Sequence, residues 1–113
     1  MTAVWTDPKT GLEWGPTAPE RMKWRKAMDW CRAQGSGWRL PTTQELETII
    51  DRSCYDPAAV KPLLGDTVPD FYWSSTTYAN SPLSAWYVFF LDGFVGASGK
   101  TNDYYVRAVR GGS

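Results

Sequence analysis

Few side chains in this sequence could carry out catalysis. It contains no histidine, which is the commonest general base and a frequent metal ligand in proteins. Cys31 and Cys54 therefore lack the partner that usually activates a thiol nucleophile. Ser74 and Ser75 lie in a strand-like segment without a sharp turn or a base, so hydroxyl catalysis is equally unsupported. We therefore expect that the protein is not an enzyme.

No pattern of ligands for a metal or a phosphate group is present either. The sequence has no Cys-x-x-Cys pair and no glycine-rich phosphate loop, so no cofactor is expected. From residue 51 onward the aspartates occur singly, without the spacing of a calcium loop: Asp51, Asp56, Asp66, Asp70, Asp92 and Asp103. The two cysteines allow at most one disulfide, and two buried free thiols are at least as compatible with the absence of a visible secretory signal.

Aromatic residues dominate what remains. Seven Trp, six Tyr and four Phe occur in 113 residues, which is a length that fits one domain, residues 1–113. Aromatic side chains supply buried area and also dominate recognition surfaces, and composition alone does not separate these roles. Twelve basic residues balance twelve acidic ones. The basic cluster fits the solvated face of one predicted helix, so we expect no nucleic-acid partner: Arg21, Lys23, Arg25, Lys26 and Arg32.

The predicted secondary structure differs between the two halves of the chain: the first half contains a hairpin and two helices, and the second contains strands. Residues 4–14 favour a hairpin with a turn at 7–11. The spacing of Thr17 and Glu20 is typical of a capping box. It predicts a helix that buries Trp24, Ala27, Met28 and Cys31 and stops near Gly35. A second capping box, Thr42 to Glu45, predicts a helix through about Asp51, and residues 53–70 resemble a long surface connection.

From residue 71 onward the hydrophobic period is two, which indicates strands. We expect strands over residues 71–75, 85–91, 94–98 and 104–110, with Asp92-Gly93 as a hairpin turn. Two helices followed by a strand-rich half predict an α+β fold, with two helices packed on a mostly antiparallel sheet. No apolar run approaches the roughly 20 residues of a membrane span, so no membrane insertion is expected.

Several motifs, in a consistent order, resemble a bacterial and phage family of C-type-lectin-like domains. The best-known member is the C-terminal domain of a bacterial collagen-like adhesin. The motifs are residues 10–14, residues 38–42 (Trp-Arg-Leu-Pro-Thr), Glu45-Leu46 with residues 49–51, residues 72–76, Ala85-Trp86 and residues 105–110. Within them, Trp38, Trp73 and Trp86 are predicted core pillars, and Arg39 and Arg107 are predicted hydrogen-bonded determinants of the fold.

The resemblance implies a scaffold that binds a protein or polysaccharide ligand on a cell surface. It implies a place on a cell surface or a phage particle, and a possible homo-oligomer. The calcium-dependent sugar motifs of animal lectins, Glu-Pro-Asn and Trp-Asn-Asp, are absent. The family often has cysteine where this chain has Ala108, which would suit a disulfide to the first helix near Cys31. That partner is missing here, so a bridge from Cys31 to Cys54 is the one pairing that the sequence leaves.

Composition changes sharply after Trp73. Residues 74–113 contain no Glu, Gln or Met, one Trp and one Lys. Some members of the family resemble the variable proteins of diversity-generating retroelements, in which adenine mutagenesis of AAC codons cannot produce these five residue types. The resemblance places a binding face in residues 77–104, at positions reachable from such codons: Tyr87, Phe89, Leu91, Asp92, Phe94, Gly96, Ala97, Ser98, Thr101, Asn102, Asp103 and Tyr104.

Strand parity orients this segment. If Trp86, Val88 and Phe90 point inward, then Tyr87, Phe89 and Leu91 point outward, joined by Phe94 and Gly96 across the turn. A contiguous apolar patch on the surface is typical of an interaction site. A fixed-specificity family member and ordinary sheet residues are alternatives. A second function class is a structural oligomerisation domain of a surface or phage fibre, which has no ligand of its own.

Overall fold

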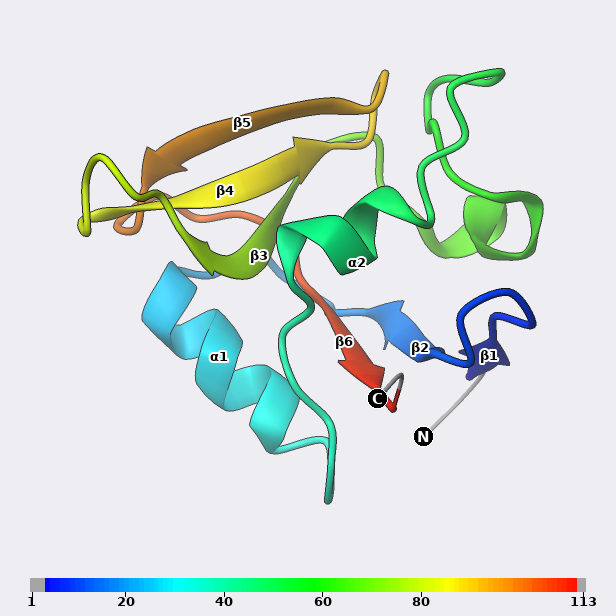
Figure 1. The fold of residues 1–113 in the computed structure, drawn as a ribbon, viewed down its shortest axis with the longest axis horizontal. Coiled ribbons are helices and arrows are strands. Elements are labelled where there is room, and N and C mark those ends of the chain that lie inside the picture. The colour runs from blue at the N-terminus through cyan, green and yellow to red at the C-terminus, as the bar shows by residue number, and fades with distance from the viewer. Residues whose placement is uncertain (1–3, 112–113) are drawn as a thin grey trace.

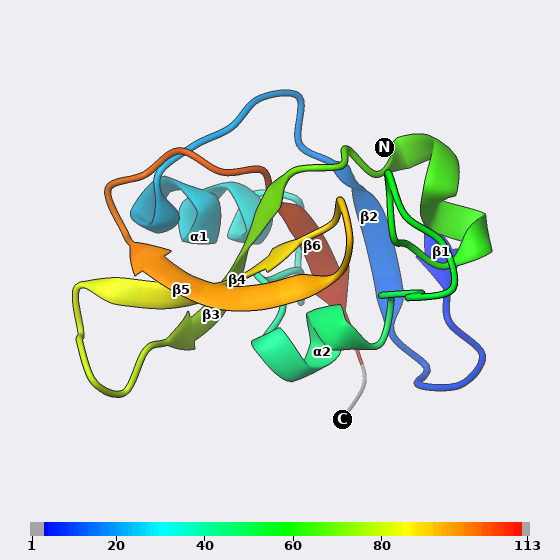
Figure 2. The same ribbon diagram turned by 90° about the horizontal axis from the view of Figure 1, so that it is seen from above.

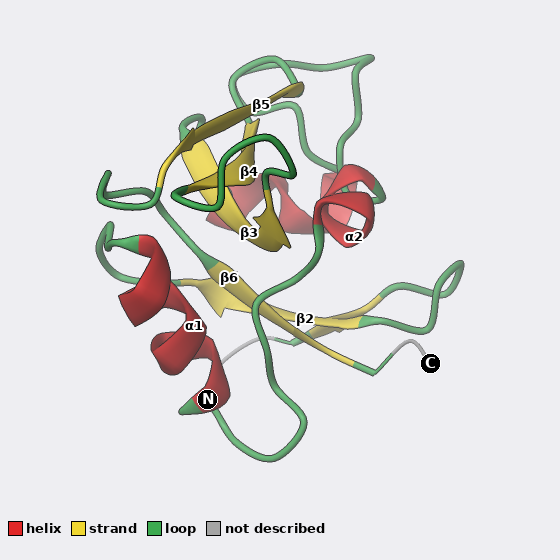
Figure 3. Cartoon of the chain, turned by 60° about the vertical axis from the view of Figure 1, so that its left-hand side comes forward, coloured by secondary structure: helices red, strands yellow, loops and turns green. Residues whose placement is uncertain are grey.

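The computed structural model describes residues 4–111 and contains two three-stranded antiparallel sheets (Figure 1). One sheet has the order β1-β2-β6, from β1 (Trp5–Thr6), β2 (Glu13–Thr17) and β6 (Arg107–Arg110). The other has the order β3-β4-β5, from β3 (Phe71–Thr77), β4 (Ser84–Phe89) and β5 (Phe94–Gly99). The α+β class is as predicted. In Figures 2 and 3 the two helices lie on different sides of these sheets.

The prediction of one sheet for the strand-rich half is wrong. The segment expected as a strand over residues 104–110 forms β6 only from Arg107, and β6 pairs with β2 of the N-terminal hairpin. Tyr104 and Tyr105 make isolated bridges instead, to Met22 and Tyr72. The period-two pattern predicts a strand but says nothing about its partner, which is a matter of tertiary structure.

The first helix, α1 (Trp24–Arg32), begins later than predicted. Thr17 does not cap it, because Thr17 ends β2 and its hydroxyl donates a hydrogen bond to the Asp66 carbonyl oxygen at 2.6 Å. Residues 18–22 run beside residues 104–106, just before β6: the Ala18 N–H donates to the Val106 carbonyl oxygen, and the Met22 N–H donates to the Tyr104 carbonyl oxygen. The predicted inward face of the helix is confirmed. Ala27 and Cys31 are buried, and Trp24 and Met28 are partly buried.

The second helix, α2 (Thr43–Glu47), has the predicted capping box. Thr42 Oγ1 accepts from the Glu45 N–H, and the Glu45 carboxylate accepts from the Thr42 N–H. Burial alone would raise the pKa of Glu45. The Arg39 guanidinium, which donates two hydrogen bonds at 2.6 and 2.7 Å, and the hydrogen bonds from Thr42 together outweigh burial and hold the pKa of Glu45 below its ordinary value. The helix ends at Glu47, earlier than expected, and the connection over residues 53–70 contains a 3₁₀ helix, η1 (Lys61–Asp66).

The core has two parts, one on each side of β3. One joins Trp14, α2, Tyr72 and Val88, and the other joins α1, Trp38 and Trp73. Trp38 and Trp73 are buried, as predicted. Trp86 is not a core pillar: it is half-buried and its ring meets the ring of Tyr78 edge to face at 5.2 Å. Trp86 shares the inward side of β4 with Val88, but its ring lines an open hollow beside α2 and is not enclosed.

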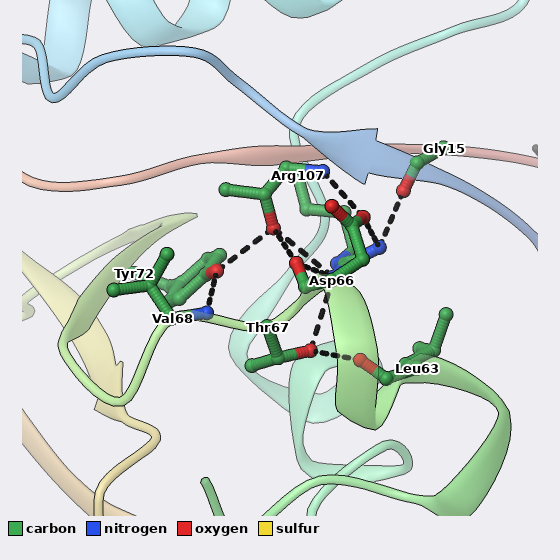
Figure 4. A network of polar contacts seen from close by, with 8 residues as sticks. Gly15, Leu63, Asp66, Thr67, Val68, Tyr72 and Arg107 are labelled. Atoms are coloured by element: carbon green, nitrogen blue, oxygen red, sulfur yellow. Dashed lines mark hydrogen bonds and ion pairs between the residues drawn. The ribbon is translucent and has the colours of Figure 1, made fainter. Parts of the chain in front are cut away.

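Arg107 of β6 joins β2 to the end of η1 through a buried network (Figure 4). Its guanidinium is 2% exposed and donates to the Gly15 carbonyl oxygen at 2.6 Å. It also donates to the Asp66 carboxylate and carbonyl oxygens, and to the hydroxyls of Thr17 and Thr67. Both predicted arginine determinants are therefore hydrogen-bonded as expected, and Arg107 holds β2, β6 and η1 together.

The two cysteines are free, so no Cys31–Cys54 bridge is present. Burial raises the pKa of the Cys31 thiol to about 12, while Cys54 is only partly buried. At pH 8 Cys31 therefore holds almost no thiolate, which is the reactive form. We expect iodoacetamide to label Cys54 well before Cys31, as measured by mass spectrometry of tryptic peptides. Equal labelling rates in the folded protein would contradict this placement of Cys31.

Candidate functional site

The outward side of the second sheet carries a continuous group of aromatic rings. Directly paired residues in an antiparallel ladder share a face. Phe71 pairs with Phe89, Phe89 pairs with Phe94, and Tyr87 pairs with Gly96. Tyr104, from the segment after β5, packs on the same rings. We call this surface the aromatic face, and its members are Phe71, Tyr87, Phe89, Phe94 and Tyr104.

The rings contact one another closely. Phe71 lies at the centre, stacked on Phe89 with 4.3 Å between ring centroids and on Tyr104 at 4.9 Å, and Tyr87 meets it edge-on at 4.9 Å. Burial, with a smaller effect of Tyr104, raises the pKa of Tyr87. The face therefore presents neutral rings and hydroxyl groups at physiological pH, which suits apolar and hydrogen-bonding contacts.

A polar rim borders the face on the side of Tyr104. The Tyr104 and Ser98 hydroxyls lie 2.8 Å apart, and the Asn102 amide donates to the Ser98 hydroxyl at 2.8 Å. These hydrogen bonds hold the Tyr104 ring against β5. The rim combines fixed aromatic area with side chains that can donate or accept hydrogen bonds, as protein recognition surfaces commonly do.

Gly96 has a specific place under Tyr87. A Cβ atom at Gly96 would lie 2.7 Å from Tyr87 Oη and 3.0 Å from the Phe94 ring. The Tyr87 ring therefore lies across the backbone of β5, where any larger residue would displace it. The absence of a side chain at position 96 sets the shape of the aromatic face.

The exposure of the face differs from the sequence expectation. Phe94 is 57% exposed, but Tyr87 and Phe89 are half-buried against Phe71. The outward direction predicted for Tyr87 and Phe89 therefore does not make them fully exposed, and replacing Tyr87, Phe89 and Phe94 together by serine would lower stability. Aromatic pairs contribute about 0.5–1.5 kcal/mol beyond area burial, and this triple change would remove several. A single substitution at Phe94 tests the surface and leaves the other aromatic pairs in place.

A comparison with models of protein families identifies the family of this chain. The model described as "Lcl C-terminal domain" matches residues 3–110, nearly the whole chain. The chain belongs to the Lcl C-terminal domain family. This is the C-type-lectin-like domain family of phage and bacterial adhesins. The comparison with curated proteins gave no match. The family is one of lectin-like adhesin domains and not a family of enzymes.

In this Lcl C-terminal domain, six of the residues predicted for binding lie together at the aromatic face or its rim. They are Tyr87, Phe89, Phe94, Gly96, Ser98 and Tyr104. Asn102 reaches the rim through Ser98, while Thr101 and Asp103 are exposed beside it in the loop after β5.

Three predicted site residues lie apart from the face. Ala97 pairs with Trp86, so it lies on the opposite side of the sheet. Leu91 and Asp92 lie in the turn, because β4 ends at Phe89 and the turn spans residues 90–93, not Asp92-Gly93 alone. The Gly93 N–H donates to the Phe89 carbonyl oxygen across it. The strand was expected to continue to Leu91, and the contacts of Phe90 and Leu91 with residues 56–58 end it earlier.

The sequence reasoning missed Phe71, the central ring. Phe71 lies outside residues 77–104, and its place depends on the register of β3 on β4. The alternation of apolar residues did predict a strand that begins at Phe71. Residues two apart share a face of a strand, so the same pattern would have placed Phe71 on the side of Trp73. Trp73 was assigned to the core, however, and one strand can face the core at one end and the surface at the other.

A hollow lies on the opposite side of the sheet from the aromatic face, where Trp86 and Val95 meet α2. It has a volume of about 410 Å³ and is also lined by Thr76, Gln44 and Glu47. The half-buried Trp86 ring forms one wall. This placement explains why Trp86 is not enclosed by the core, although its strand position points inward.

Within residues 4–111, no three His, Cys, Asp or Glu side chains gather closely enough to hold a metal ion. No helix of that part of the chain has the length and apolar character needed to cross a membrane. We expect EDTA to leave the melting temperature unchanged, since a ligand stabilises a protein only by binding its folded state. A calcium-dependent rise of several degrees in differential scanning calorimetry would contradict this expectation.

Proposed function

We propose that this domain is a non-catalytic recognition module whose contact surface is the aromatic face. The observation that supports the proposal is the Phe94 ring, 57% exposed and continuous with four further rings. A contiguous apolar surface of this kind is uncommon without a partner, whereas single exposed apolar residues are ordinary. The proposed ligand is a protein or polysaccharide on a cell surface.

The geometry favours contact over catalysis. The face contains rings and hydroxyls but no acid, base or activated nucleophile among its members. Rigid aromatic side chains bury large areas with little loss of conformational entropy, so they serve as anchors in binding surfaces. The hydrogen-bonded pair of Ser98 and Tyr104 fixes one edge of the face before a ligand arrives. Such preorganisation lowers the entropic cost of binding.

The binding test compares two exposed apolar positions. We expect Phe94→Ser to weaken binding of the labelled domain to intact bacterial cells and to a glycan array at least about tenfold, as for loss of an interface anchor. Leu83→Ser is the matched control, because Leu83 is 78% exposed in the β3–β4 loop, outside the face. Both variants should keep the wild-type melting temperature within a few degrees. Equal binding of Phe94→Ser and wild type at every target would refute the proposed surface.

We further propose that the face belongs to a retroelement-diversified variable protein. The support is the residue usage of positions 74–113 and the gathering of six candidate variable positions at one surface. The gene neighbourhood tests this directly. We expect a reverse transcriptase gene near an adenine-rich near-copy of the codons for residues 77–110. A neighbourhood with neither element would identify a family member of fixed specificity.

A further inference from the structure

The chain covers the outer edge of β3. The Trp73 N–H donates to the Tyr105 carbonyl oxygen, and the Tyr105 N–H donates to the Phe71 carbonyl oxygen, both at 3.0 Å. Further along, the Ser75 N–H donates to the Pro41 carbonyl oxygen. The backbone groups on this side of β3 are thereby paired within the chain and unavailable to another strand.

The edges of the other sheet are also protected. Arg39 exchanges two 2.9 Å hydrogen bonds with Val109 of β6, so that edge is occupied by the chain itself. At the opposite edge, β1 is only two residues long. A very short edge strand offers too few backbone groups to direct pairing with another molecule.

The edge of β5 has neither kind of protection. β5 is the outermost strand of its sheet and lies nearest the viewer in Figure 2, with no other segment in front of it. The Lys100 N–H donates to the Leu83 carbonyl oxygen, so Lys100 points its N–H toward β4. Because N–H groups along a strand alternate in direction, every second residue before Lys100 does the same. Residues 94, 96 and 98 then bond β4, and residues 95, 97 and 99 direct their N–H groups outward. Within residues 4–111, no hydrogen bond from outside β4 reaches Val95 or Ala97.

The side chains of β5 also leave this edge open. The strand has six residues, Phe-Val-Gly-Ala-Ser-Gly, with no charge and no proline. Its ladder with β4 runs through six consecutive pairs without a bulge, whereas both β3–β4 and β2–β6 contain a register shift. Charged side chains, proline and bulges are the usual devices that prevent edge pairing, and β5 has none of them. Arg52 donates to the Gly93 carbonyl oxygen and lines a hollow with Phe94 and Val95, so it lies at the turn end of β5 and not beside Ala97.

We propose that the free edge of β5 pairs antiparallel with β5 of a second copy of this chain. A twofold axis perpendicular to the strands would join two three-stranded sheets into one of six strands. Small side chains at the centre, Gly96, Ala97 and Ser98, allow close approach. The Lys100 ammonium is held by Thr77 and the Pro82 carbonyl oxygen of its own chain, so it does not place a positive charge along this edge. The formal net charge of zero adds no repulsion between copies.

The pairing has a consequence for the aromatic face. Across such an axis, directly opposed residues of the two β5 strands keep the same side of the sheet. The two aromatic faces would then adjoin on one surface and present two contact areas to a ligand. The pairing itself does not depend on what that face binds. Because few backbone hydrogen bonds contribute, we expect a dimer that forms and dissociates with concentration.

Sedimentation equilibrium between about 10 μM and about 1 mM tests the pairing. We expect the wild-type mass to rise from the 12.7 kDa of one chain toward twice that value. Ala97→Pro removes only an outward N–H, which an edge strand tolerates, so this variant should fold and stay monomeric. Ala97→Ser keeps the N–H and is the matched control, which should dimerise like wild type. A wild-type protein that remains monomeric throughout would overturn the proposal and leave the proposed binding function unaffected.

Amide hydrogen exchange provides a second measurement on the unmodified chain. In dilute protein the amides of Val95 and Ala97 should exchange rapidly, while those of residues 96 and 98 are protected by β4. At high concentration the first pair should become protected as well, at least about tenfold. A dimer that survives Ala97→Pro, or that forms without protection of Val95 and Ala97, would assign the interface to another surface and refute pairing at β5.

Discussion

Trp73→Ala is expected to lower the free energy of unfolding by about 3–5 kcal/mol, as for removal of a fully buried tryptophan. Trp73 has no exposed surface, and its indole N–H donates to the Met22 carbonyl oxygen at 3.0 Å. Its ring also packs on Tyr104 with 4.6 Å between centroids. Alanine would leave a cavity between the second sheet and the segment before α1, and it would leave the Met22 carbonyl oxygen without this donor.

Trp86→Ala provides the matched comparison, since both tryptophans lie in the same sheet. Trp86 is half-buried and lines the hollow beside α2, so we expect a loss of only about 1–2 kcal/mol. Urea denaturation followed by circular dichroism measures both variants. Losses of equal size would show that Trp86 is a core residue, as the sequence had suggested, and would contradict its position at the end of the core.

Arg107→Met is expected to destabilise the domain by about 3–5 kcal/mol, because it removes one partner from a buried polar network. The Gly15 carbonyl oxygen and the Thr67 hydroxyl are left in the interior without the donors that now satisfy them. Methionine retains much of the apolar stem, so the change reports mainly on the guanidinium. The midpoint and slope of urea denaturation give the loss directly.

Arg21→Met controls for the loss of a positive charge. The Arg21 side chain is 57% exposed, and its guanidinium lies 3.8 Å from the Asp70 carboxylate. Exposed ion pairs contribute between zero and about 1 kcal/mol, so this variant should unfold close to wild type. If Arg107→Met were no more destabilising than Arg21→Met, then apolar packing, and not Arg107, would hold β2, β6 and η1 together.

Local features of the chain were predictable from the sequence, because their physical causes lie within a few residues. The capping box of Thr42 and Glu45 formed as predicted, since both hydrogen bonds join residues three apart. The N-terminal hairpin formed for the same reason, with Trp5 opposite Trp14 across a short turn. The similar spacing of Thr17 and Glu20 failed, because the network around Asp66, 49 residues away, uses the Thr17 hydroxyl.

Three properties could be predicted from the sequence alone: the fold class, the family, and the parity of β4, which places Tyr87 and Phe89 on the side opposite Val88. Alternation along a strand is a local property and needs no partner. Three features could not be predicted without the folded structure: the sheet that β6 joins, the central place of Phe71 in the aromatic face, and the position of Trp86 in a hollow beside α2. Each of these depends on strand register and on where one element ends above another, which are contacts between distant residues. The open edge of β5 also depends on distant contacts, because the pairing of all the other strands decides which strand lies at the edge of a sheet.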